Sequence, residues 1–102
     1  MNDRELLELA AKAACYQVEW VRNSGCHYRC EEDIGRERWC PLDDDGDALR
    51  LAVKLRTSIF LASNNTACES VGDDYWFDDG IDAAAARRAI VNAAARIGRA
   101  MP

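Results

Sequence analysis

Residues 39–55 read WCPLDDDGDALRLAVKL and predict a helix with a well-defined start. Asp43, Asp44 and Asp45 can each accept a hydrogen bond from the free N–H groups of a first helical turn. The helix dipole also favours negative charge at this end. Beyond these acids, apolar residues recur at helical spacing on one face, at Ala48, Leu51, Ala52 and Leu55. We expect this helix to be the central element of the fold.

Two further helices are expected near the two ends of the sequence. The first covers residues 3–14 and can be capped by Asn2 or Asp3. The last begins at Asp82, where acidic residues again precede the helix. Its apolar residues recur at helical spacing and predict one buried stripe, made of Ala86, Ile90, Ala93, Ala94, Ile97 and Met101.

Between the helices, β-prone segments are separated by turn signals. The expected strands are residues 16–22, 57–62, 66–71 and 75–77, with a weaker candidate at 27–30. Residues 31–35 are expected to form a loop. The last three strands have tight connections, which predict an antiparallel meander. The order predicts one α+β domain over residues 1–102, with a mainly antiparallel sheet packed against about three helices, as in an α/β/α sandwich.

Composition and charge narrow the class of protein. The chain has 102 residues, of which 49% are hydrophobic and 30% charged, as in a globular domain. A net charge of −5 disfavours direct binding to nucleic acid or to an anionic membrane. No apolar run is long enough to span a bilayer, and residues 1–5 carry charges of both signs, unlike a signal peptide. We therefore expect a cytoplasmic protein.

Two segments together resemble a known group of proteins. Residues 39–55 combine Trp39, Pro41 and an acidic helix start, and residues 86–101 read ARRAIVNAAARIGRAM. This combination is similar to small bacteriophage proteins of the phage ABA-sandwich group, whose function is unknown. The resemblance implies a sheet between helices, a phage or prophage origin and a bacterial cytoplasm, and it carries over no catalytic residues. Residues 26–40 depart from that group, which lacks their cysteine cluster.

Cysteine and histidine form the one cluster with the character of metal ligands, at Cys26, His27, Cys30 and Cys40. Three thiolates and an imidazole can complete a tetrahedral zinc site, with Cys15 or Cys68 as possible substitutes. The spacing, however, is not the usual one of two zinc knuckles, in each of which two residues separate the ligands. Free cysteines also commonly serve as small buried hydrophobic residues. The main expectation is therefore that no cofactor is bound. A zinc-stabilised structural or regulatory domain is the alternative.

The same cluster offers a thiol nucleophile. Cys26 and His27 are adjacent, so on a strand their side chains would point to opposite faces. Cys30 or Cys40 can still meet His27, but no orienting acid or oxyanion motif accompanies them. We therefore expect a protein that is not an enzyme. A disulfide between two of the cysteines is expected only on purification.

Acidic and aromatic residues suggest a binding surface instead. Asp43, Asp44, Asp73 and Asp74 precede helices or lie in turns, and capping explains part of this pattern. If they share one side of the fold, they form an acidic surface suited to a basic partner. Trp76 lies between two aromatic residues on one strand, so either it or its neighbours must face away from the core. An exposed aromatic near acids suits a protein interface or a homodimer.

These observations lead to one main hypothesis. The chain is expected to be a non-enzymatic phage or prophage accessory protein that binds a host protein or protein complex. The resemblance suggests inhibition of a host defence system, such as a CRISPR effector complex, as its role. The predicted contacts are Asp43, Asp44, Asp73, Asp74 and Trp76.

Overall fold

The computed structural model describes residues 2–31, 35–71 and 74–102, which form an α+β fold. Within these residues three helices alternate with two groups of three strands. In order, the elements are α1 (Asp3–Ala13), β1 (Val18–Val21), β2 (Cys26–Glu31), β3 (Gly35–Trp39), α2 (Asp45–Leu55), β4 (Ile59–Leu61), β5 (Thr66–Glu69), β6 (Tyr75–Asp78) and α3 (Ala83–Ala100). The predicted class is confirmed. No helix in these ranges is both long enough and apolar enough to cross a membrane.

Each helix begins at a side-chain cap that the sequence indicated. The side chain of Asn2 accepts a hydrogen bond from the backbone N–H of Glu5 at the start of α1, at 2.8 Å. Asp44 caps α2 and Asp82 caps α3 in the same way. Helix α2 ends at Arg56, whose backbone is left-handed with φ of 58°. Helix α2 therefore has the start expected from residues 39–55, but α3 rather than α2 packs against the most elements: α1, α2, β5 and β6.

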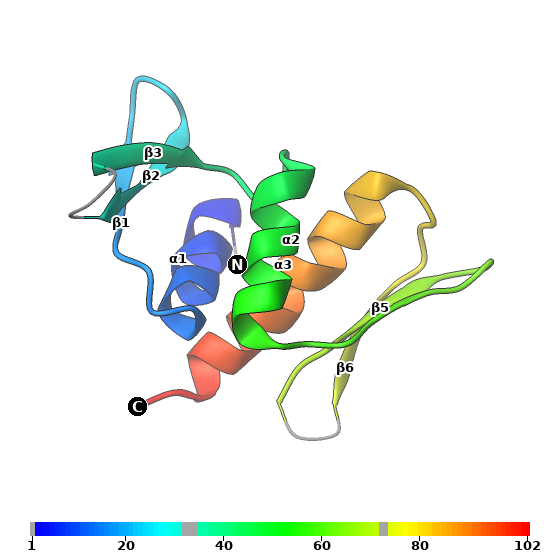
Figure 1. The fold of residues 1–102 in the computed structure, drawn as a ribbon. Coiled ribbons are helices and arrows are strands. Elements are labelled where there is room, and N and C mark those ends of the chain that lie inside the picture. The colour runs from blue at the N-terminus through cyan, green and yellow to red at the C-terminus, as the bar shows by residue number, and fades with distance from the viewer. Residues whose placement is uncertain (1, 32–34, 72–73) are drawn as a thin grey trace.

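The helices form the core of the molecule. Figure 1 shows all three packed together, with α2 and α3 crossing near the centre. Helix α1 makes its most extensive contact with α3, and the buried residues between them are mostly alanines. Gly98 of α3 lies directly against α1: a Cβ atom there would overlap the carbonyl oxygen of Leu9 and lie 2.9 Å from its carbonyl carbon. Small side chains therefore let these two backbones approach closely, and Leu51 of α2 fills the centre of the core.

The six strands form two separate antiparallel sheets of three strands, whereas the sequence suggested one sheet. We call β1-β2-β3 the first sheet and β4-β5-β6 the second sheet. They lie on opposite sides of the helices (Figure 1). The second sheet is the predicted meander. In the first sheet, β3 was not expected to be a strand, because four of its five residues are exposed and three are charged. It forms by pairing with β2, and residues 32–34 of the expected loop lie outside the described residues.

Candidate functional site

The register of the second sheet sorts its side chains into an inner and an outer face. Ile59 pairs with Cys68, which pairs with Trp76, and all three pack against the helical core. The next row contains Phe60, Ala67 and Phe77. Because successive side chains of a strand point to opposite faces, this second row faces away from the helices.

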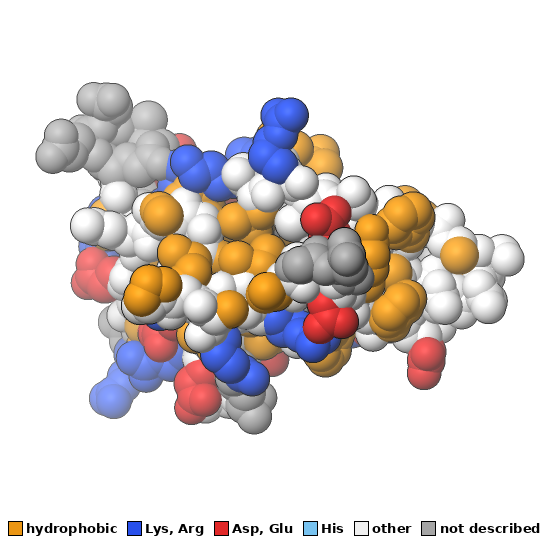
Figure 2. Space-filling model, turned by 90° about the horizontal axis from the view of Figure 1, so that it is seen from below, with side chains coloured by type: hydrophobic (Ala, Val, Ile, Leu, Met, Phe, Trp, Pro, Cys, Tyr) orange, Lys and Arg blue, Asp and Glu red, His pale blue; other side chains and the backbone are white. Residues whose placement is uncertain are grey.

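The outer face carries three aromatic rings, Phe60, Tyr75 and Phe77, which we call the aromatic patch. The centroids of Phe60 and Tyr75 are 5.5 Å apart, and those of Tyr75 and Phe77 are 6.4 Å apart. Phe60 remains 55% exposed and Phe77 62% exposed, whereas Ala67 between them is buried. Figure 2 shows hydrophobic side chains gathered over the arm that the second sheet forms, at the right of the view. The rings therefore cover the sheet but are not themselves covered.

Further exposed apolar side chains border the patch. Leu61 ends β4 and is 73% exposed, and Ile81 follows β6 and is 69% exposed. Both lie at the Thr66 end of the sheet, since Leu61 pairs with Thr66 and the Thr66 hydroxyl donates to the Gly80 carbonyl oxygen at 3.1 Å. Leu61 is adjacent to Phe60 and therefore points to the opposite face of the sheet, so the aromatic patch itself consists of the three rings.

The charge around the aromatic patch has one sign. Residues 57–86 contain six acidic residues and no Lys, Arg or His. Glu69 pairs with Tyr75 and therefore belongs to the outer face, and Asp79 is exposed just after β6. Asp78 instead binds Arg88 of α3, and this hydrogen bond, with one from the Gly80 N–H, lowers the pKa of the Asp78 carboxyl. The patch is therefore an apolar surface in a negatively charged setting.

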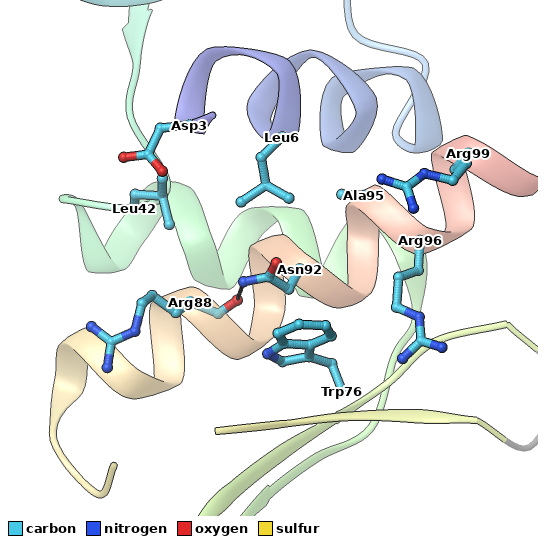
Figure 3. A pocket seen from close by; sticks show the side chains of 9 residues that line it. All are labelled: Asp3, Leu6, Leu42, Trp76, Arg88, Asn92, Ala95, Arg96 and Arg99. Carbon is cyan, nitrogen blue, oxygen red and sulfur yellow. Dashed lines mark hydrogen bonds between the residues drawn. The ribbon is translucent and has the colours of Figure 1, made fainter. Parts of the chain in front are cut away.

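Trp76, the aromatic residue predicted as a contact, points to the inner face. Figure 3 shows it directed from β6 toward α3, beside Asn92 and Arg96. It lines a groove of about 620 Å³ to which α1 also contributes Asp3 and Leu6. The Arg96 guanidinium lies 5.9 Å from the Trp76 ring centroid, and the Trp76 indole nitrogen is buried without a hydrogen-bond partner among the described residues. The exposed aromatics of β6 are thus its neighbours, Tyr75 and Phe77.

The described residues among the predicted acidic contacts precede two different elements, α2 and β6. Asp43 and Asp44 lie at the start of α2, at the top of Figure 1, whereas Asp74 precedes β6 near the bottom. Asp44 is engaged as a helix cap, and Asp74 accepts a hydrogen bond from Arg96 at 3.0 Å. Asp73 lies outside the described residues. The acidic surface formed by these residues stays a prediction.

The predicted zinc ligands are divided between the two faces of the first sheet. His27 is fully buried toward α1, where its Nε2 lies 3.1 Å from a carboxylate oxygen of Glu8. Cys26 and Cys40 lie on the other face and contact each other and Arg38. Cys30 is half-buried, and its Sγ lies 4.0 Å from the Tyr28 carbonyl oxygen.

Within the described ranges, no three Cys, His, Asp or Glu side chains gather as a metal site would require. All five thiols are free. The zinc-stabilised alternative stays a prediction, and elemental analysis of protein purified without added metal tests it.

The sequence analysis did not identify Phe60 as a contact residue. It included Tyr75 and Phe77 only through the alternative that the neighbours of Trp76 face away from the core. The signal was present as a strand in which Tyr75 and Phe77 alternate with Trp76. Alternation along a strand shows which residues share a face, but it does not show which of the two faces packs against the helices. A large ring on the adjacent strand β4 at Phe60 was the further indication of an aromatic face.

Comparison of the chain with protein-family models, curated proteins and solved structures finds no match. The resemblance to the phage ABA-sandwich group therefore stays a prediction.

Proposed function

We propose that this protein acts by binding another protein through the aromatic patch, without catalysis of its own. The observation that carries the proposal is the exposure of Phe60 and Phe77 on a sheet face whose opposite side already packs against the helices. Contiguous exposed apolar surface commonly marks a protein interface. Aromatic side chains are enriched at such interfaces and contribute much of their binding energy.

The charge of the second sheet defines the chemistry of the partner. With acidic residues and no basic ones over residues 57–86, the patch favours a partner whose apolar surface is bordered by Lys or Arg. Complementary charges of this kind speed association and help to exclude wrong partners. We therefore expect binding to weaken as salt is raised.

A second copy of the chain fits this surface less well. Two such faces brought together would place Glu69 and Asp79 of one copy near the same acids of the other. Like charges that face each other across an interface oppose association. The homodimer suggested by the sequence is therefore the competing outcome, and sedimentation of the protein alone tests it.

The resemblance noted above extends the proposal to a cellular role. We propose that the partner is a host protein complex in a bacterial cytoplasm and that binding inhibits a host defence system, such as a CRISPR effector complex. Expression of the chain in bacteria that carry an active CRISPR system tests this role. Phage infection should recover with the wild-type chain but not with a variant of the aromatic patch.

Site-specific crosslinking tests the binding surface directly. A photoreactive phenylalanine analogue placed at position 60 should crosslink a bacterial protein, and the crosslinked peptide should be apolar with Lys or Arg nearby. The same analogue placed at position 49 is the control, because Leu49 is similarly exposed on α2. Equal crosslinking from both positions, or crosslinking from position 49 alone, contradicts the proposal.

Substitution of the aromatic patch provides a second test. The F60T/F77T double variant should lower capture of the crosslinked partner by at least about tenfold, because two aromatic contacts are removed. The L49Q/V53Q double variant alters exposed apolar residues of α2 and should leave capture unchanged. Unchanged capture by a folded F60T/F77T protein would show that the partner binds elsewhere.

A further inference from the structure

Two buried cysteines meet where β2 pairs with the end of β3. His27 and Trp39 form the last pair of the β2–β3 ladder, and Cys26 and Cys40 directly adjoin this pair, one on each segment. Directly opposite residues of antiparallel strands have Cα atoms about 4.5–5.5 Å apart. A disulfide requires Cα atoms about 4.4–6.8 Å apart. The two thiols are also close enough to interact electrostatically.

Arg38 joins the two thiols on the same face of the sheet. Its Nε donates a hydrogen bond to the Cys26 sulfur at 3.2 Å, and its guanidinium also reaches the Cys40 thiol. A guanidinium beside a sulfur favours the thiolate, which is the nucleophilic form of cysteine. Burial, followed by the contact with Cys26, raises the pKa of Cys40 to about 11. Because the hydrogen bond from Arg38 Nε goes to the Cys26 sulfur, we assign Cys26 as the attacking sulfur and Cys40 as the neighbouring thiol.

A small oxidant can reach the pair. Cys26 is 7% exposed and Cys40 8% exposed. Both cysteines line a cavity of about 130 Å³, and Cys40 and Arg38 also line a hollow of about 350 Å³ next to the start of α2. Hydrogen peroxide is neutral and little larger than water, so it fits this route.

We propose that Cys26 and Cys40 are a peroxide-sensitive pair that closes to an intramolecular disulfide. The Cys26 thiolate attacks one oxygen of hydrogen peroxide, the O–O bond breaks, and Cys26 becomes a sulfenic acid. The departing hydroxide takes up the proton that the Cys26 thiol had released and leaves as water.

The Cys40 sulfur then attacks the Cys26 sulfur as the S–O bond breaks. The released hydroxide takes the Cys40 proton and leaves as a second water. Two thiols have lost two electrons, and peroxide has been reduced to water. A thiol reductant reverses the modification.

The disulfide would connect the first sheet to the start of α2. The backbone N–H of Cys40 already donates to the Asp47 side chain at 2.9 Å, so this residue is held at the helix start. A covalent link from Cys26 to this point restricts the unfolded chain. The oxidised protein should unfold several degrees higher than the reduced protein.

Peptide mapping tests the proposal on the unaltered chain. The fully reduced protein is treated with hydrogen peroxide, blocked with an alkylating agent and digested with trypsin. Before blocking, the intact mass should fall by two hydrogen atoms. After digestion, peptide 23–29, which contains Cys26, should be linked to peptide 39–50, which contains Cys40. Linkage of other cysteines, overoxidation without a disulfide, or no reaction would overturn the proposal.

Variants then separate the roles of the two sulfurs and of Arg38. In C40S, a sulfenic acid should accumulate at Cys26 and react with dimedone, whereas labelling at another cysteine would contradict the assignment. R38M should form the disulfide several-fold more slowly than the wild type. R36M is the matched control on the same strand, because Arg36 pairs with Glu19 and contacts Tyr28. Equal rates in R38M and the wild type would overturn the role of Arg38.

Discussion

The two sheets have the same strand topology, but their outer faces differ in how the aromatic rings are covered. On the first sheet, the outward ring of Tyr28 is covered by Arg36, whose guanidinium lies 5.1 Å from the ring centroid. Arg36 in turn pairs with Glu19 at 3.5 Å. On the second sheet, Phe60 and Phe77 are neighbours of Tyr75 on a face without basic residues. One sheet thus covers its aromatic ring with charge, and the other leaves its rings exposed.

The inner faces are alike, which makes the outer difference informative. The first sheet directs Trp20, His27 and Trp39 toward the helices, and the second directs Ile59, Cys68 and Trp76. Each sheet thus packs against the helices through one face only. Exposed rings contribute little to stability, because they remain in contact with water. The exposed rings of the aromatic patch therefore contribute little to the stability of the fold, in line with the binding role proposed above.

The largest expected effect on stability comes from a substitution at Gly98, in the contact between α1 and α3 on which both sheets depend. G98A places a methyl group against the backbone of α1 and should lower the free energy of unfolding by about 3 kcal/mol. Because α1 and α3 form the core, both sheets should lose protection together. Hydrogen exchange of the two sheets measures this, and selective loss in one sheet would contradict a shared core.

G46A is the control for this prediction. The atoms near an added Cβ at Gly46 belong to the side chains of Arg50 and Asp44, and they can move. Alanine also favours a helix over glycine by roughly 0.5–1 kcal/mol. G46A should therefore leave stability unchanged or raise it slightly.

A smaller effect should distinguish the two faces of the second sheet. Trp76 and Phe77 are adjacent, and threonine preserves strand propensity at both positions. W76T removes a ring that packs on the core and should cost about 2 kcal/mol of stability. F77T removes an exposed ring and should change stability by no more than about 0.5 kcal/mol. Urea unfolding measures both, and equal effects would contradict the assigned faces.

The smallest effect concerns the attachment of the first sheet to α1. The hydrogen bond from His27 is the largest cause that lowers the pKa of Glu8 below its ordinary value of 4.5. A carboxyl whose pKa is lower in the folded state stabilises that state at any pH above the pKa that it has in the unfolded chain. This contribution is lost as the pH falls through the pKa of the folded state. The wild type should therefore lose slightly more stability than E8Q between neutral pH and the acidic range.

Thermal unfolding across pH measures this difference. E5Q is the control in the same helix, since Glu5 is exposed and does not contact His27. A pH profile of E8Q identical to that of the wild type would show that the Glu8 carboxylate does not stabilise the attachment.

The sequence predicted the local structure well because local signals determine it. Asn2, Asp44 and Asp82 cap helices through side-chain hydrogen bonds that depend on neighbouring residues alone. Strand β3 was missed because residues 35–38 are exposed and lack apolar alternation. Its formation depends on pairing with β2, and pairing between segments leaves no periodic signal within one of them.

The sites were harder to predict for the same reason. Cys26 and Cys40 meet only through the register of β2 and β3, so missing β3 concealed their pairing. Likewise, the position of α3 determines that Trp76 faces inward. Asp43 precedes α2 and Asp74 precedes β6, so their relative positions depend on how these two elements pack. Each of these outcomes depends on tertiary packing rather than on residue type.

The close approach of α1 and α3 has a consequence for synthesis on the ribosome. These helices are separated in sequence by both sheets and by α2. The apolar side of α1 must therefore wait for α3 to emerge before it is covered. Contacts between distant segments slow folding because a long loop must first close. During that interval a nascent chain exposes α1, and a chaperone that recognises short apolar helices would find its binding site there.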